Sequence, residues 1–180
     1  ERGVFAVGDG EPRLPDRGLA IRVATPRIDA DAWKNYLPEG SNGGADAGGL
    51  ALNVVSLKTP LLRVFERDFS NVDLTLRPRD SGWQIGLNTK EAVGDIFWKS
   101  AGEGWVEGNF KRLVVRPAAE IGEGSTTLIN TLPGMSLSVD DLHIGDKALG
   151  KLELKARNDK GAWHLDTLNL QNPDAVLKGK

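Results

Sequence analysis

The sequence predicts a mainly β protein: a curved, open antiparallel sheet built from repeats, with one or two short helices. Three observations lead to this class. Hydrophobic residues recur with a period of two, as in strands with one apolar and one polar face. Glycine is abundant, with 22 residues against 9 prolines, which suits a turn-rich β chain. The same strand pattern also occurs twice along the chain.

Alternating segments mark the expected strands. Aliphatic residues alternate with polar or small ones over residues 19–23, 50–54, 72–76, 85–87 and 152–154. Turn sequences separate these strands at residues 80–82 (DSG), 101–104 (AGEG) and 158–161 (NDKG). Each segment is therefore predicted to be a half-buried strand of an antiparallel sheet.

Helical signal is confined to two places. Residues 28–37 (IDADAWKNYL) begin with acidic residues and precede a proline, which predicts a short helix anchored by Trp33 and Tyr36. Residues 125–132 are expected to form another short turn. The glycine-rich residues 41–49 (SNGGADAGG) are expected to be a linker or loop.

The two copies of the strand pattern start at residues 50 and 135. Leu52, Val54 and Leu57 match Leu137, Val139 and Leu142. In both copies the alternation slips by one residue before the third aliphatic, which predicts a β-bulge. Residues 72–87 then match residues 151–168, and the first copy carries a longer connection at residues 60–69 than the second has at residues 146–150.

The repeat predicts the domain organisation. Residues 1–40 are expected to form a strand and a short helix, residues 41–49 the linker, residues 50–134 the first β repeat and residues 135–180 a second, truncated repeat. The first copy continues past its tryptophan strand into a hairpin, whereas the second ends where that hairpin is expected. We therefore expect the chain to be a section of a longer β protein with flanking repeats.

Composition argues against several classes of function. The formal net charge is -2, and basic residues are interspersed with acidic ones, so no basic stripe is present to bind nucleic acid. The absence of cysteine excludes disulfides and thiolate chemistry. No apolar run approaches the roughly 20 residues of a membrane span, and the first residues lack the pattern of a signal peptide.

No catalytic or metal-binding motif is recognisable, so neither an enzyme nor a cofactor is predicted. His143 and His164 lack the partners of a zinc site. Asp140 and Asp141 are adjacent on the expected bulge, where their side chains diverge and suit solvation better than paired acid–base chemistry. The glycines of AGEGWVEG precede a strand rather than a helix, so they are interpreted as a hairpin turn and not as a phosphate loop.

Three stretches resemble the YhdP family of AsmA-like bacterial envelope proteins: residues 3–33 (GVFAVGDGEPRLPDRGLAIRVATPRIDADAW), 132–157 (LPGMSLSVDDLHIGDKALGKLELKAR) and 161–180 (GAWHLDTLNLQNPDAVLKGK). The resemblance implies a periplasmic protein of a Gram-negative bacterium, anchored in the inner membrane by a segment absent from this chain. It also implies movement of phospholipid between the inner and outer membranes through an apolar β groove. Phospholipid acyl chains and flanking β repeats are the implied partners.

The alternating aliphatic residues are the candidates for lining such a groove: Leu52, Val54, Val72, Leu74, Leu76, Ile85, Leu87, Leu137, Val139, Leu152, Leu154 and Leu165. The same residues also suit a core packed against protein, and both interpretations remain open. In that second case the protein is a structural scaffold spanning the periplasm. A further alternative is a carbohydrate-binding β-sandwich in which Trp83 and Trp163 form an exposed platform; these residues and Trp105 otherwise suit packing at hairpin ends.

Overall fold

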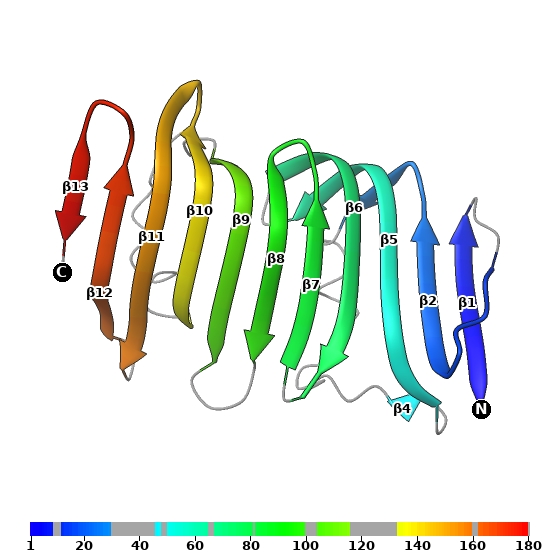
Figure 1. The fold of residues 1–180 in the computed structure, drawn as a ribbon. Coiled ribbons are helices and arrows are strands. Elements are labelled where there is room, and N and C mark those ends of the chain that lie inside the picture. The colour runs from blue at the N-terminus through cyan, green and yellow to red at the C-terminus, as the bar shows by residue number, and fades with distance from the viewer. Residues whose placement is uncertain are drawn as a thin grey trace. The chain divides into compact units, whose positions relative to one another are not determined.

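The computed structural model describes residues 1–8, 12–29, 46–47, 50–64, 67–80, 82–99, 104–115, 133–159 and 162–179. The chain divides into two compact units, Glu1–Lys90 and Glu91–Lys180. In each unit the described strands form an open β-sheet, and the described ranges contain no helix (Figure 1). The prediction of a mainly β protein with an open sheet is therefore confirmed.

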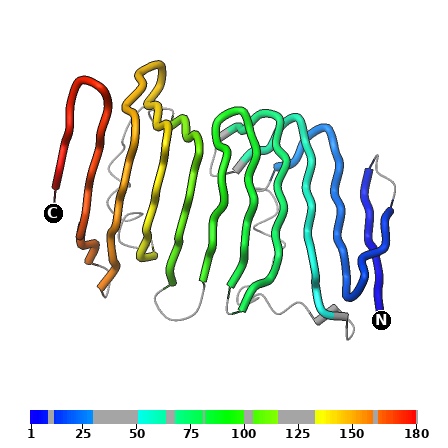
Figure 2. The backbone as a smooth tube through the Cα atoms, in the orientation of Figure 1, coloured from blue at the N-terminus to red at the C-terminus, as the bar shows by residue number. Residues whose placement is uncertain are grey.

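Unit 1 contains seven of the strands. They are β1 (Arg2–Gly8), β2 (Gly18–Ala24), β3 (Arg27–Asp29), β4 (Asp46–Ala47), β5 (Leu50–Val64), β6 (Arg67–Arg79) and β7 (Gly82–Asn88). The main strands follow the order β1-β2-β5-β6-β7, and both β3 and β4 pair with β5. The pairs β1–β2 and β2–β5 are parallel, whereas β5, β6 and β7 form an antiparallel meander (Figure 2).

Unit 2 contains the remaining strands. They are β8 (Ala92–Lys99), β9 (Trp105–Val115), β10 (Gly134–Ile144), β11 (Lys147–Asp159), β12 (Ala162–Gln171) and β13 (Val176–Gly179). They lie side by side in sequence order (Figure 1). Only β9 and β10 pair in parallel among them, and the other neighbours are antiparallel.

Both units share one strand plan. A strand (β2 or β9) pairs in parallel with the first strand of a three-stranded antiparallel meander (β5-β6-β7 or β10-β11-β12). The sheet is therefore mixed: the antiparallel pairing predicted from the sequence holds within the meanders, whereas β1–β2, β2–β5 and β9–β10 are parallel. Parallel neighbours need a crossover of about a dozen residues or more, and the segments that join β2 to β5 and β9 to β10 are long enough.

The predicted bulge is confirmed in the second copy and wrong in the first. The pairing of β10 with β11 shifts between Val139 and Leu142. In β5, by contrast, the pairing with β6 is regular from Val55 to Leu57, and the shift lies earlier, opposite β2, between Leu52 and Val54. At this shift the Asn53 side-chain amide donates a hydrogen bond to the Arg17 carbonyl oxygen at 2.9 Å, which ties β5 to the segment before β2.

The extra residues of the first copy do not form a longer connection. They extend both strands of the hairpin, so that β5 runs to Val64, β6 starts at Arg67, and Leu62 pairs with Phe69. Pro60 is tolerated inside β5 because it falls between the stretch that pairs with β2, up to Lys58, and the stretch that pairs with β3, from Leu61. β3 pairs with the extended part of β5 along the edge that faces away from β6.

The helix predicted over residues 28–37 does not begin where expected, because Ile28 and Asp29 belong to β3. The rest of that segment, including Trp33 and Tyr36, and residues 125–132 lie outside the described ranges. Within the expected linker, Asp46–Ala47 form β4 and pair with β5. Strand pairing across the sheet has thus overridden a local helical signal at residues 28 and 29.

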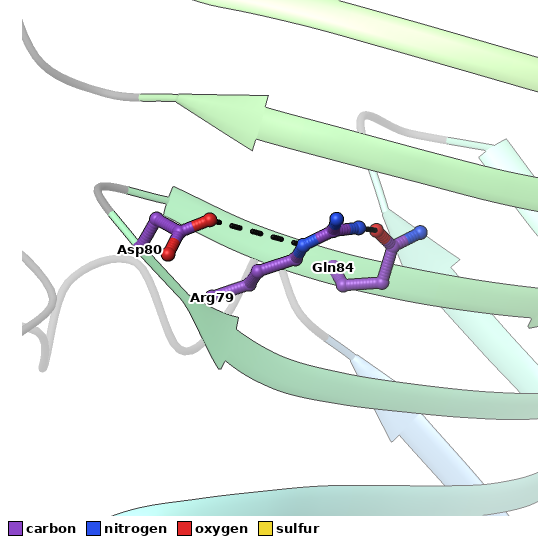
Figure 3. Close-up of polar contacts among 3 residues, drawn as sticks. All are labelled: Arg79, Asp80 and Gln84. Atoms are coloured by element: carbon purple, nitrogen blue, oxygen red, sulfur yellow. Dashed lines mark hydrogen bonds and ion pairs between the residues drawn. The ribbon is translucent and has the colours of Figure 1, made fainter.

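The predicted turn between β6 and β7 is a tight connection, with Arg79 opposite Gly82. Asp80 has a φ of 49°, in the left-handed region that both common two-residue hairpin turns require at their first central residue. Nη1 of Arg79 donates to Oε1 of Gln84 at 3.4 Å, and Nε lies 3.9 Å from Oδ2 of Asp80 (Figure 3). The two charged side chains are well exposed, so this contact adds little stability.

Candidate functional site

The sheet of unit 1 has one apolar face. Residues paired across neighbouring strands project from the same side of a sheet, so a row of apolar pairs marks an apolar surface. Two rows cross five strands: Phe5–Ile21–Val55–Leu76–Ile85 and Val7–Val23–Leu57–Leu74–Leu87. We call these rows the unit 1 apolar face. The opposite face carries the row Lys58–Asp73–Asn88, in which the first two side chains form an ion pair of 3.0 Å.

Unit 2 has the same asymmetry. Three rows form the unit 2 apolar face: Trp98–Val106–Met135–Ala156–Leu165, Ile96–Gly108–Leu137–Leu154–Leu168 and Gly94–Phe110–Val139–Leu152–Leu170–Leu177. The opposite face carries the row Asp95–Asn109–Ser138–Glu153–Asn169–Lys178. The alternation of apolar and polar residues along each strand therefore gives the unit 2 sheet one apolar face and one polar face.

Burial changes across the apolar faces. In unit 2 the middle strands hold the buried residues Val139 and Ala156, whereas Trp98 on β8 and Leu177 on β13 are exposed by 43% and 56%. In unit 1 Val72 is buried on β6, and Phe5 on β1 is exposed by 58%. Apolar surface is thus solvent-accessible on the outer strands named here, beside a well-packed centre.

The structure places the predicted groove residues on these faces, with one exception. Leu52 shares its face with Leu19, and the other candidates from Val72 to Leu165 lie in or beside the rows. Val54 instead pairs with Ala20 on the opposite face. The irregularity at Asn53 reverses the alternation, so Val55 occupies the row position that the sequence assigned to its neighbour.

Sequence reasoning missed a second apolar feature, the ring of Phe110. A Cβ added to Gly94 would lie 2.9 Å from Cδ1 of Phe110, and one added to Gly108 would lie 2.8 Å from Cε2. The Phe110 ring therefore occupies the space that side chains would fill at these two glycines. The signal in the sequence is glycine at two strand positions where the alternation requires an apolar residue.

The polar residues singled out in the sequence form no convergent site. Nε2 of His143 lies 2.9 Å from Oδ1 of Asp141, Asp140 is exposed, and His164 pairs with Arg157 on the polar side of β11 and β12. The described residues contain no group of three side chains that could hold a metal ion. In the same part of the chain, no helix is long and apolar enough to cross a membrane.

The tryptophans at the strand starts lie in three different hairpins. Trp83, Trp105 and Trp163 are each half-buried, near the first residue of β7, β9 and β12. Trp105 packs against Gly134, where an added Cβ would lie 2.7 Å from Cε3 of the indole. These rings cap the ends of the sheets and do not form a flat exposed platform within either unit.

Comparison with known proteins places the chain in one family. No curated protein and no solved structure matches it. The family model described as YhdP protein matches residues 1–180, the full length of the chain. The chain therefore belongs to the YhdP family of bacterial envelope proteins.

Proposed function

We propose that the two apolar faces bind phospholipid acyl chains, and that this chain acts without catalysis in moving phospholipid between the inner and outer membranes. It would do so in the periplasm of a Gram-negative bacterium, as a section of an inner-membrane-anchored protein. The observation that carries the proposal is the set of uninterrupted apolar rows that cross successive strands in each unit.

A lipid that moves between two membranes must overcome a large free-energy barrier. Exposing hydrocarbon to water costs roughly 0.8 kcal/mol per methylene, so a two-chain lipid that crosses an aqueous space faces a barrier on the order of 20 kcal/mol. Apolar rows on a sheet remove most of this cost for the part of each acyl chain that lies on them.

The composition of the rows suits transient binding. Most members are valine, leucine or isoleucine of similar size, and no polar side chains converge within the rows to fix a ligand at one position. Neighbouring positions therefore offer acyl chains similar binding energy. A carrier needs this property, because a lipid that binds too tightly at one position does not move on.

The alternatives differ in what lies on the apolar rows. In a scaffold, protein covers them completely and no lipid reaches them. A carbohydrate-binding sandwich needs a second sheet packed on the first, whereas the main strands of each unit form a single sheet, and Trp83 and Trp163 are half-buried. The structure therefore gives the sandwich no support, and the scaffold is the alternative that an experiment must separate.

Site-specific photocrosslinking in the intact protein, within its own membranes, separates them. A photoreactive residue at Leu74, Leu87 or Leu154 is expected to yield lipid adducts, because these positions lie on the apolar faces. Matched controls at Thr75 and Lys155, the next residues on the same strands, project from the polar faces and are expected to yield none. No adducts at the leucines, while a known lipid carrier reacts, would favour the scaffold.

A further inference from the structure

The polar face of unit 1 carries more positive than negative charge at its centre. It lies on the side of the sheet opposite the unit 1 apolar face, and its central row is Ala6–Arg22–Ser56–Thr75–Gly86. One neighbouring row adds Arg77, and the other adds the ion pair of Lys58 with Asp73. The centre of this face therefore holds a lysine and two arginines against a single acid, which the lysine already engages.

Strand pairing gathers cations that the sequence keeps far apart. Arg22, Lys58 and Arg77 belong to β2, β5 and β6, which lie side by side in unit 1 (Figure 1). Adjacent strands are about 5 Å apart, and alternate residues of one strand are about 7 Å apart. Long side chains reach diagonal neighbours at such distances. All three cationic side chains can therefore reach a ligand that lies over Ser56, the residue between them on this face.

Arg22 is a half-buried cation without a counter-ion. Its Nε is shut off from solvent and has no hydrogen-bond partner, and the residue makes no ion pair within the described ranges. A charged group withdrawn from water is ordinarily paired with an acceptor. Asp73 does not fill this role, because its Oδ2 lies 3.0 Å from Nζ of Lys58. A bound anion would supply the partner that the Arg22 guanidinium lacks.

The neighbours of Arg22 add hydrogen-bond donors on one side and small side chains on the other. Ser56 and Thr75 continue its row across β5 and β6, and each carries a hydroxyl group. Ala6 is its partner on β1, so no bulky side chain crowds the guanidinium there. Guanidinium pairs with phosphate through two parallel N–H donors, and hydroxyls donate to further phosphate oxygens. A tetrahedral phosphate can present oxygens to all three strands at once, whereas a planar carboxylate cannot.

We propose that the centre of this polar face binds a phosphate group. We call it the Arg22 site, and its members are Arg22, Ser56, Lys58, Thr75 and Arg77. The guanidinium of Arg22 and the two hydroxyls contact the phosphate, while Lys58 and Arg77 attract it from the neighbouring rows. The phosphate belongs to a soluble compound or to the surface of an anionic bilayer. Because the site lies opposite the apolar rows, this inference does not rest on the proposed function.

Binding is measured on the full 180-residue chain by NMR titration with sodium phosphate at constant ionic strength. The reporters are the backbone amides of Ser56 and Thr75 and the Nε–H of Arg22, which burial protects from exchange with water. We expect saturable shifts at these reporters with a dissociation constant on the order of 1 mM, as for a few charge-assisted contacts in a solvent-accessible site. Sodium chloride at the same ionic strength is expected to cause no saturable shift.

Variants separate direct contact from long-range attraction. Arg22→Gln is expected to weaken phosphate binding about tenfold, whereas Arg22→Lys keeps the charge without the paired N–H donors and is expected to weaken it about threefold. Arg77→Gln changes an exposed side chain, so folding is preserved, and a loss of about twofold is expected that disappears at high salt. The matched control is Lys155→Gln, which removes an exposed cation from the polar face of unit 2 and is expected to leave binding unchanged.

Two further probes distinguish the sources of the phosphate. Glycerol 3-phosphate that binds as tightly as inorganic phosphate would assign the Arg22 site to a soluble phosphate ester. Preference for phosphatidylglycerol over phosphatidylcholine vesicles that is lost in Arg22→Gln would assign it to an anionic bilayer, whereas vesicle binding that survives this substitution would overturn the bilayer as the source.

The Arg22 site itself would be refuted by two results. One is the absence of saturable shifts at the reporters with both inorganic phosphate and glycerol 3-phosphate. The other is phosphate binding that neither Arg22→Gln nor Arg77→Gln weakens.

Discussion

Replacement of Gly108 by alanine tests the packing of Phe110 on the unit 2 apolar face. A Cβ at this position would lie 2.8 Å from Cε2 of Phe110 and 2.8 Å from Cδ2 of Leu137. Both atoms belong to side chains, so each must move by somewhat under 1 Å to reach ordinary contact. Overpacking of this kind costs about 1–3 kcal/mol, and we expect a loss of about 2 kcal/mol in the free energy of unfolding.

The measurement is urea unfolding of the full chain, combined in a double-mutant cycle with Phe110→Leu. The smaller leucine makes room for the methyl group, so the double variant is expected to be more stable than the sum of the single losses by about 1 kcal/mol. The control is Gly179→Ala, where the nearest atom to an added Cβ lies at 3.6 Å and a change within about 0.5 kcal/mol is expected. A neutral Gly108→Ala, or strict additivity in the cycle, would refute this account of the packing.

Three further predictions concern the faces of the sheets. Val139→Ala is expected to lower the free energy of unfolding by about 2 kcal/mol, because that side chain is 1% exposed, whereas Val176→Ala at 58% exposure should change it by less than about 0.5 kcal/mol in the same urea assay. A photoreactive residue is expected to capture lipid at position 55 and not at 54; adducts of equal yield would contradict the assigned faces. Lys58→Ala should cost less than about 1 kcal/mol, and less still in 1 M salt, because its ion pair is exposed.

Local periodicity was enough to predict most of the long strands and most of the face composition, but not β3, which begins in the segment predicted to be helical, or β4, which lies in the expected linker. Alternation of aliphatic and polar residues depends only on the strand repeat of two, so the positions of Leu74, Leu76, Leu152 and Leu154 followed from the sequence. The break in the alternation before Leu142 also predicted the β-bulge of β10 correctly. These features need no knowledge of which strand lies next to which.

The features that depend on a neighbouring strand were not predictable in this way. The irregularity at Asn53 arises from its hydrogen bond to Arg17, which lies 36 residues away in the chain, and it moves Val54 to the other face. The parallel pairs arise from crossovers, which leave no periodic signal. The cavity in unit 2 that Trp105, Arg157 and Asp159 help to line is likewise assembled from the ends of three strands, so no local sequence motif predicts it.

The parallel pairing of β9 with β10 also has a consequence for folding kinetics. The meander of β10, β11 and β12 and the hairpin of β8 and β9 close through short connections, so they are expected to form early. Docking of one on the other must close the segment from residue 116 to residue 133, which costs more chain entropy.

Until that docking occurs, β9 has an unpaired edge and Phe110 lacks its neighbour Val139. Such an edge is open to pairing with another molecule, so the step before docking is the one at which self-association competes with folding. We therefore expect the yield of refolded protein to fall as its concentration rises. Chaperones that hold extended chains are expected to bind at this stage, before the parallel pair of the unit is complete.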